Sequence, residues 1–370
     1  MTRLDGLYLD HGQSAWVDNI RRDWLNDGTL QSLVDRGVRG VTSNPSIFAK
    51  AVATTPAYDS IIASLGLTDA EEAFEALAVA DVQDACAILR PVYDASMREF
   101  AAGTRRSTDG YVSLEVSPRL AHDTDGTIAA AKRLAARVGD HPNLMIKIPA
   151  TKAGLPAVSA VLASGISVNV TLIFSLGRYR EVLDAFVEGV RRAQADGHDI
   201  SRIASVASFF ISRVDSAIDP MLPEDSPLRG TIANAQAASA YQLFLDHAQS
   251  PSMASLLQSG CQIQRPLWAS TSTKNAAYDE LLYVDTLVAP ETVNTMPDPT
   301  LEAFSRKGEP SRSELANDEI RNALASNLQR LDELDIALSD VTDTLERDGV
   351  TAFITSYDEL LATVAGKLPR

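Results

Sequence analysis

The chain has 370 residues, 45% of them hydrophobic, and a formal net charge of −16. Nucleic acid and anionic membranes are therefore poor partners, because both are themselves negatively charged. Only two cysteines occur, Cys86 and Cys261, which excludes a disulfide framework and a thiolate metal motif. The opening MTRLDGLYLD lacks the apolar segment of a signal peptide, and no run approaches the ~20 apolar residues of a membrane span, so we expect a cytoplasmic protein.

Alternating apolar and polar residues predict eight strands separated by helical segments. Strands joined by long helices are typical of parallel βα units, and eight such units can close into a barrel. We therefore expect an α/β fold, a (β/α)8 TIM barrel with extra helices, in one domain over residues 1–370. The predicted strands cover residues 6–10, 39–43, 110–116, 143–148, 166–173, 203–211, 265–270 and 285–289.

Helical patterns fill most of the intervals between these strands. Thr68 and Glu71 form a candidate capping box before one long helix, and Asp125 is a candidate cap for the next. An insertion at about residues 217–260 contains an alanine-rich helical stretch over residues 231–257.

The end of the chain, about residues 313–370, is predicted to add helices after the barrel closes. Two amphipathic stretches, residues 313–333 and 351–367, follow a surface connection marked by Pro297, Pro299, Gly308 and Pro310. This region could cap the mouth of the barrel or form a subunit contact, but packing on the barrel wall is the simplest expectation.

Lys147 stands in the run NLMIKIPAT, inside a predicted strand that otherwise carries apolar residues. Burial of an unpaired ammonium group is costly, so such a lysine tends to release its proton and become an amine nucleophile. A lysine that reaches water or pairs with a carboxylate is the alternative. Lys152, nearby in TKAG, is a weaker candidate because its predicted loop would leave it solvated.

Neighbouring strands share the same division into an aliphatic face and a polar face. In a barrel, the aliphatic face would meet the helices and the polar side chains would converge at the C-terminal rim. The polar face includes Asp10, Ser113, Glu115, Lys147, Asn169 and Thr171, and the aliphatic face includes Leu9, Leu114, Ile146, Val170 and Leu172.

Motifs for metals and nucleotides are missing from the sequence. The five histidines form no HxxxH or HxH spacing, and the glycines form no GxxxxGK[ST] or GxGxxG run. We therefore expect chemistry without a metal or another cofactor.

The segments GVTSNPSIF, VSLEVSPRL, NLMIKIPAT, SVNVTLIFS and ASFFISRVD, in this order, resemble the transaldolases. WASTSTKN and TLVAPETVNTMP are similar to the bacterial and plant-type branch in particular. The resemblance implies a barrel of the class I aldolase group. It also implies transfer of a dihydroxyacetone unit from sedoheptulose 7-phosphate to glyceraldehyde 3-phosphate in the pentose phosphate pathway. The expected partners are sugar phosphates, with the chain as a monomer or homodimer.

The resemblance also implies the catalytic residues. Lys147 matches the Schiff-base lysine, and Asp10 matches the first-strand aspartate that moves the hydroxyl proton during carbon–carbon cleavage. Glu115 and Thr171 match the pair that holds the water of imine formation and hydrolysis. A helix-cap role for Asp10 and a plain buried hydrogen bond for Thr171 are the structural alternatives.

Substrate-binding residues follow from the same resemblance. Asn44 and Asn169 match the amides that bind donor hydroxyls, although an asparagine before Pro45 also suits a turn. The candidates for the phosphate end are Ser212, Arg213, Ser270 and Lys274, with Lys274 offset from the arginine of the other branch.

Two other functions remain open. A lyase of the same superfamily would release free dihydroxyacetone, but such lyases tend to have glutamine at the position of Glu115. A sugar-phosphate sensor without catalysis is the third possibility, because a fold alone guarantees no activity. The set of lysine, aspartate, glutamate and threonine argues against it.

Overall fold

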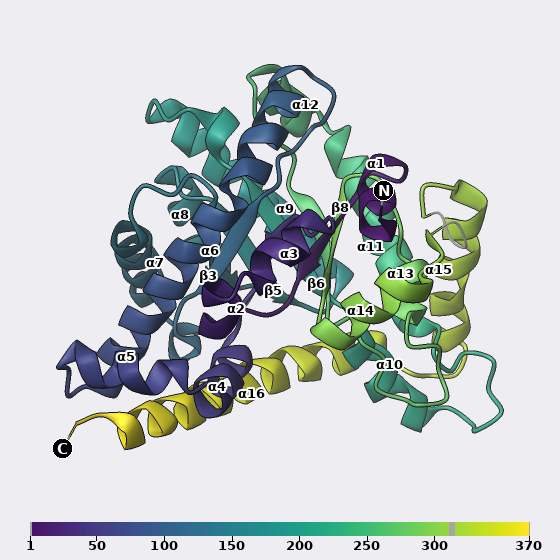
Figure 1. Ribbon diagram of the computed structural model, residues 1–370. Helices are drawn as coiled ribbons and strands as arrows, with labels where there is room; N and C mark the ends of the chain where they lie inside the picture. Colours follow the sequence, from purple (N-terminus) through teal and green to yellow (C-terminus); the bar gives the residue numbers. More distant parts are fainter. Residues whose placement is uncertain (1, 311–314, 370) are drawn as a thin grey trace.

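The computed structural model describes residues 2–310 and 315–369. Eight parallel strands close into a barrel in chain order, with β8 beside β1, which confirms the predicted (β/α)8 architecture (Figure 1). The strands are β1 Gln13–Val17, β2 Gly40–Val41, β3 Tyr111–Glu115, β4 Leu144–Pro149, β5 Val168–Ile173, β6 Ser205–Phe210, β7 Arg265–Ala269 and β8 Thr292–Met296.

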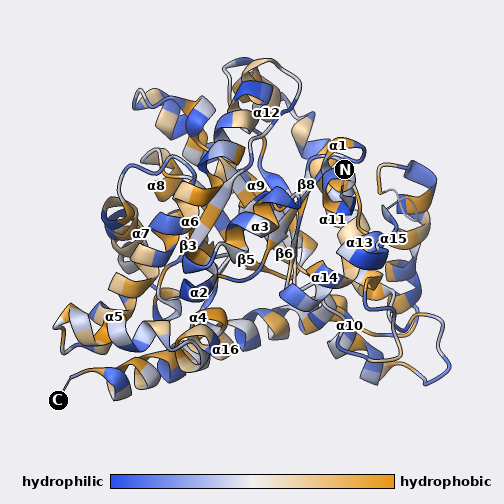
Figure 2. Cartoon of the chain, in the orientation of Figure 1, coloured by the Kyte–Doolittle hydropathy of each residue, from blue (hydrophilic) through white to orange (hydrophobic). Residues whose placement is uncertain are grey.

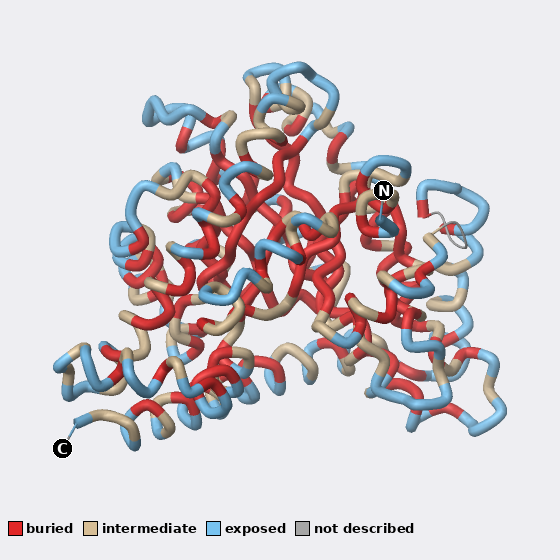
Figure 3. The backbone as a smooth tube through the Cα atoms, viewed as in Figure 1, coloured by how far each residue is buried: buried red, intermediate tan, exposed pale blue. Residues whose placement is uncertain are grey.

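Helices surround the barrel, and hydrophobic and hydrophilic residues alternate along them (Figure 2). Buried positions concentrate in the strands and on the helix sides that face them (Figure 3). None of the described helices is long and apolar enough to cross a membrane. The helices are α1 Arg3–Leu9, α2 Arg22–Asn26, α3 Thr29–Asp35, α4 Pro45–Thr54, α5 Ala57–Leu65, α6 Ala70–Ala101, α7 Thr124–Val138, α8 Gly154–Ala163, α9 Leu176–Ala195, α10 Ser212–Ile218, α11 Ile232–Ala248, α12 Pro251–Gln258, α13 Leu282–Asp285, α14 Asp298–Lys307, α15 Asp318–Asp332 and α16 Leu338–Lys367, with short 3-10 turns η1 Pro118–Leu120, η2 Ile200–Arg202 and η3 Asp219–Met221.

The first predicted strand, residues 6–10, is wrong because this segment belongs to helix α1. Thr2 and Asp5 form a capping box at its start, and the buried residues Leu4, Leu7 and Tyr8 have the spacing of one helix face. The alternation of apolar and polar residues in LYLD fits a strand, but four residues are too few to distinguish a strand from a helix. The true first strand is β1, whose residues are all buried.

The last predicted strand, residues 285–289, is also wrong. Asp285 ends helix α13, and Leu287, Val288 and Ala289 are buried in the outer core without joining the sheet. A short apolar run indicates burial but does not by itself specify a strand. The eighth strand begins at Thr292.

Helix boundaries differ from the sequence predictions by small shifts. Asp69 rather than Thr68 caps α6, and Asp123 rather than Asp125 caps α7. The predicted surface connection contains helix α14, with Pro299 in its first turn. Backbone N–H groups in the first turn of a helix have no partner within the helix, so a proline, which lacks an N–H, is tolerated there.

The C-terminal region is more helical than predicted. Positions 313 and 314 of the predicted 313–333 helix lie outside the described residues, and α15 begins at Asp318. Helix α16 begins at Leu338 instead of residue 351. It does not simply pack on the outer wall, because it lies along α4 and α10 and touches β5 at the mouth of the barrel (Figure 1).

The division between outward and inward strand faces is confirmed at most positions. Leu114, Ile146 and Val170 belong to the shell between barrel and helices, whereas Met145 belongs to the interior cluster. Leu172 is the exception, because it lies in the interior cluster. Its φ of 60° and a register shift between β5 and β6 form a bulge that turns this side chain inward.

A buried ion-pair network closes the N-terminal end of the barrel. Asp109 pairs with Arg265 at 2.9 Å and with Arg39 at 3.1 Å, and accepts hydrogen bonds from Ser14 and Trp16. Since its polar groups are matched, this end is a packed plug, which leaves the C-terminal end for a site.

Candidate active site

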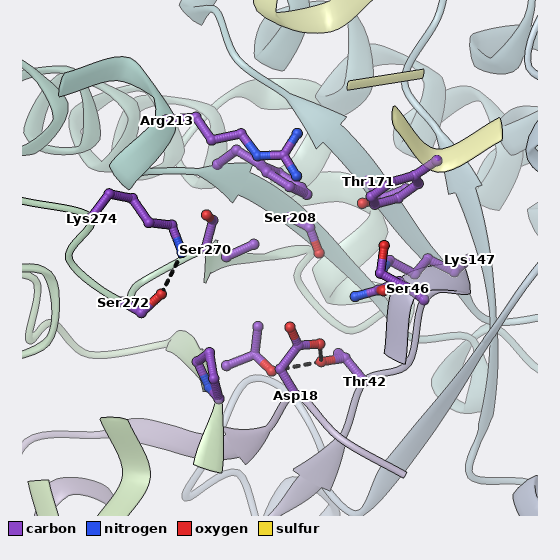
Figure 4. A pocket seen from close by; sticks show the side chains of 16 residues that line it. Asp18, Thr42, Ser46, Lys147, Thr171, Ser208, Arg213, Ser270, Ser272 and Lys274 are labelled. Atoms are coloured by element: carbon purple, nitrogen blue, oxygen red, sulfur yellow. Dashed lines mark hydrogen bonds between the residues drawn. The ribbon is translucent and has the colours of Figure 1, made fainter. Parts of the chain in front are cut away.

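A cavity of about 170 Å³ opens at the C-terminal mouth of the barrel (Figure 4). Strand ends and the loops after them supply most of its walls, and α16 supplies Phe353. The lining residues are Asp18, Thr42, Asn44, Ser46, Lys147, Thr171, Ser208, Phe210, Arg213, Ala269, Ser270, Ser272, Lys274, Thr295, Pro297 and Phe353.

Lys147 points into this cavity from β4 and is 4% exposed. Its Nζ lies 3.4 Å from Oε2 of Glu115 and donates a hydrogen bond of 3.1 Å to the backbone oxygen of Ser43. The lysine is thus buried and paired with a carboxylate, so of the alternatives drawn from the sequence the structure shows the carboxylate pairing. Lys152 is exposed, as expected, and does not line the cavity.

Glu115 lies beside Lys147 because β3 and β4 pair these two residues in register. Burial raises the pKa of Glu115 to about 7, and the charge of Lys147 limits the rise. A carboxyl group with this pKa can take up and release a proton at neutral pH. Thr171 lines the cavity from β5, and its hydroxyl is buried without a hydrogen-bond partner among the described residues.

The acidic residue contributed by the first βα unit is Asp18, and the prediction of Asp10 is wrong in its placement. Asp10 is the exposed C-cap residue of α1 and does not line the cavity. Asp18 directly follows β1 and accepts a hydrogen bond of 2.6 Å from Thr42 (Figure 4). Burial raises the pKa of Asp18, and the charge of Lys147 opposes that rise.

The two predicted asparagines have different positions. Asn44 lines the cavity while its side-chain oxygen caps α4 through the N–H of Ile47, so it has the structural role considered above and is also exposed to the cavity. Asn169 is fully buried behind the lining. It donates to Ser113 and accepts from Ser208 at 2.7 Å, and therefore orients the Ser208 hydroxyl that lines the cavity.

Two cations lie on the side of the cavity opposite Lys147, Arg213 from α10 and Lys274 from the loop after β7 (Figure 4). Burial lowers the pKa of Arg213, and burial followed by the charge of Arg213 lowers the pKa of Lys274. Within residues 2–310 and 315–369, neither forms an ion pair with a carboxylate. Two like charges without an anion form a binding place for one, such as a phosphate group.

Serine hydroxyls complete this cationic end. Ser270 lines the cavity, while Ser212 lies behind it with its hydroxyl 3.0 Å from that of Ser270. Ser272 accepts a hydrogen bond of 2.8 Å from Lys274. Ser270 has a φ of 57°, a left-handed conformation that is uncommon outside glycine and often marks a functional position.

Reasoning from the sequence missed Asp18, Thr42, Ser208, Phe210 and Phe353. Asp18 carried a usable signal, because an acid directly after the buried run QSAWV lies at the carboxyl end of a strand. Phe353 carried no such signal, since its place depends on how α16 crosses the mouth. In the described part of the chain, no three His, Cys, Asp or Glu residues cluster closely enough to hold a metal ion.

The chain is similar to proteins of one family along nearly its whole length. The family model described as Transaldolase/Fructose-6-phosphate aldolase matches residues 15–364. A protein named transaldolase from a Parafrankia species is 48% identical over 366 residues, covering 96% of each chain. Transaldolases of Acidothermus cellulolyticus and Thermobifida fusca are 48% and 46% identical, covering 97% of this chain and 95% and 96% of their own.

Proposed function

This chain belongs to the transaldolase/fructose-6-phosphate aldolase family and is an enzyme of the transaldolase type, and we propose that it works through a Schiff base on Lys147. In this proposal it moves a dihydroxyacetone unit from sedoheptulose 7-phosphate to glyceraldehyde 3-phosphate, giving erythrose 4-phosphate and fructose 6-phosphate. We also propose that it acts in the cytoplasm, in the non-oxidative pentose phosphate pathway, because charged sugar phosphates do not cross membranes unaided.

The reaction would begin when the amine of Lys147 attacks the donor ketone. Glu115, next to the amine, would supply the proton with which the hydroxyl of the adduct leaves as water, and Thr171 would hold that water. The cationic iminium that remains withdraws electrons from the neighbouring carbon–carbon bond.

Asp18 would then remove the proton from the donor hydroxyl, so that this bond breaks and the first aldose leaves. The three-carbon unit stays on Lys147 as an enamine. When the enamine carbon attacks the acceptor aldehyde, Asp18 would return the proton to the new hydroxyl. Water held by Thr171 would then add to the product iminium with Glu115 as the base, which breaks the C–N bond, frees the ketose and restores the amine of Lys147. The raised pKa of Asp18 suits a group that alternates between base and acid.

Binding would use the two ends of the cavity for different parts of the sugar. Asn44 and Ser208, the latter oriented by Asn169, would bind hydroxyls of the three-carbon unit, because both line the cavity. Arg213 and Lys274 would hold the phosphate, together with Ser270. An adjoining cavity of about 500 Å³ also contacts Asp18, Asn44 and Lys274, which leaves room for acceptor aldoses.

The observation that carries this proposal is the pairing of Lys147 with Glu115 at 3.4 Å, opposite two cations that have no carboxylate partner among the described residues. A fructose-6-phosphate aldolase is the alternative within the same family, and it would release dihydroxyacetone without any acceptor. Glu115 beside the lysine favours transfer. A sensor without catalysis would have no use for a buried lysine, glutamate and aspartate together.

Acceptor dependence separates these functions. With fructose 6-phosphate as donor, we expect sedoheptulose 7-phosphate to form only when erythrose 4-phosphate is present. A Lys147→Met variant should lose turnover by several orders of magnitude, while Lys152→Met, a matched change five positions along the chain, should not. Release of dihydroxyacetone at the same rate without acceptor would favour the lyase, and turnover in Lys147→Met would overturn the proposal.

A further inference from the structure

Phe353 of α16 lies over the reactive lysine, with the Nζ of Lys147 5.8 Å from the centre of its ring. We propose that Phe353 keeps water from the enamine that remains on Lys147 after the first aldose leaves, and thereby sets the ratio between transfer of the three-carbon unit and its release as free dihydroxyacetone. This inference rests on the proposed Schiff base. Phe353 takes no proton and forms no bond, so it is a positioning residue.

Helix α16 is held at several points around the mouth of the barrel. Arg178 on α9 pairs with Glu346 at 3.2 Å, and Tyr357 donates a hydrogen bond of 2.9 Å to Glu71 on α6. Near its end, Lys367 donates a hydrogen bond of 2.9 Å to the backbone of α4. Helix α16 therefore forms a fixed cover, and substrates must enter on another side.

The middle of α16 fits closely into the barrel. Val350 and Phe353 are each 4% exposed and belong to the interior cluster that also contains Leu172 and Phe174. A Cβ atom on Gly349 would lie 3.2 Å from Leu172 and 3.4 Å from Phe174. A glycine thus allows the helix to approach the bulge of β5, which brings the Phe353 ring down to the cavity.

The two sides of Lys147 therefore differ in their access to water. The side toward α16 is closed by an aromatic ring, whereas the side toward Asp18 and Lys274 continues into the adjoining cavity. A bound sugar phosphate would fill the open side during transfer. After the first aldose leaves, the covered side must still exclude water, and Phe353 is the lining residue that α16 supplies there.

Release of dihydroxyacetone from Lys147 would occur in two steps, protonation and hydrolysis. The enamine carbon gains a proton from a water molecule and becomes the iminium of dihydroxyacetone. Water then adds to the carbon of the C=N bond, the C–N bond breaks, and free dihydroxyacetone leaves with the amine of Lys147 restored. The water consumed equals the water lost when the imine formed. An aromatic ring beside the cation also stabilises the iminium.

The test compares Phe353→Ala with Phe353→Met, which keeps most of the volume over Lys147. Val364→Ala, a buried change on the same helix away from the cavity, is the control for loss of stability. Dihydroxyacetone release and sedoheptulose 7-phosphate formation are measured together with fructose 6-phosphate and erythrose 4-phosphate. We expect the ratio of release to transfer to rise about tenfold in Phe353→Ala, and to stay near that of the unchanged enzyme in the other two.

An unchanged ratio in folded Phe353→Ala would overturn the inference, as would an equal rise in Val364→Ala. If Phe353→Ala does not fold, Phe353→Val tests the same point, with a smaller expected rise in the ratio. Borohydride reduction of the unchanged enzyme with fructose 6-phosphate keeps the two proposals distinct. An adduct on Lys147 with an unchanged ratio contradicts only the role of Phe353, whereas absence of the adduct contradicts the Schiff base itself.

Discussion

The Nζ atom of Lys147 lies 3.4 Å from Oε2 of Glu115, and their side chains are only 5% and 6% exposed. Register between β3 and β4 produces this contact, since the two residues are direct neighbours across the sheet. Water screens a buried pair little, so the charge of Lys147 opposes the rise that burial causes in the pKa of Glu115. The sheet itself therefore places a carboxyl group beside the lysine that we propose as the nucleophile.

Replacement of Glu115 by glutamine should change the pH profile of kcat/KM. Burial raises the pKa of Glu115 to about 7, so in the unchanged enzyme the carboxylate form increases as the pH rises through about 7. Since the protonated carboxyl group is the form that supplies the proton in the proposed loss of water, we expect kcat/KM to fall as the pH rises through about 7. In Glu115→Gln the limb near pH 7 should disappear and the plateau should fall by about 10²–10⁴. If kcat/KM of the variant still changed with pH near pH 7, the pH dependence would belong to another group.

Matched variants of Asp18 and Asp10 test which of the two aspartates acts as the base. Asp18→Asn keeps the size of the side chain but removes the base, and we expect kcat to fall by about 10²–10⁴. Asp10→Asn alters only an exposed helix cap and should leave kcat unchanged. Steady-state kinetics with fructose 6-phosphate checks both. Loss of activity in Asp10→Asn alone would restore the assignment to Asp10.

The cationic end should distinguish phosphorylated from unphosphorylated donors. We expect Arg213→Ala and Lys274→Ala to raise KM for fructose 6-phosphate by about 10- to 100-fold each, because a charge-assisted hydrogen bond contributes about 1.5–3 kcal/mol. Activity with fructose should change little. Arg202→Ala removes an exposed arginine far from the cavity and is the control. Equal losses with both donors would mean that these residues do not hold the phosphate.

Asp109→Asn should destabilise the fold without acting on the site. Burial opposes ionisation of Asp109, yet Arg265 and Arg39 outweigh it and lower the pKa. The stabilisation is therefore fully present above the unfolded pKa of ~3.9 and is lost as the pH falls through the lower folded value. At pH 7 we expect a loss of about 3–5 kcal/mol, because Arg265 would lose its buried carboxylate partner.

Urea denaturation at pH 7 measures this loss, with Asp94→Asn as the matched control. Asp94 pairs with Arg90 on the exposed side of α6, so its variant should unfold at nearly the same urea concentration as the unchanged protein. Equal stability of Asp109→Asn and the unchanged protein would contradict the role given to the buried network.

The strands that carry polar residues at regular alternate positions could be predicted from the sequence. Lys147, Glu115 and Thr171 lie on inward faces because alternation along a strand fixes the face once the strand is found. Leu172 departs from this rule, because a bulge depends on pairing with the next strand and leaves no trace in a hydrophobic pattern. The strand prediction also failed for short apolar segments such as residues 6–10. Over so few residues, the spacing of apolar side chains fits a helix as well as a strand.

Contacts between distant parts of the chain could not be predicted in this way. Phe353 reaches Lys147 only because α16 crosses the mouth of the barrel, and this path depends on Gly349 and on ion pairs with other helices. Lys274 meets Arg213 through the closure of β6 against β7. The sequence shows which side chains are apolar, but the positions of Phe353 and Lys274 in the cavity are fixed only when the whole barrel is folded.

The most direct test of the account is borohydride reduction in the presence of fructose 6-phosphate, followed by peptide mass spectrometry. We predict one sugar-derived adduct per chain, located on Lys147, and no adduct in Lys147→Met. An adduct on Lys152 or another lysine, or full turnover without any adduct, would contradict the claim that Lys147 is the nucleophile.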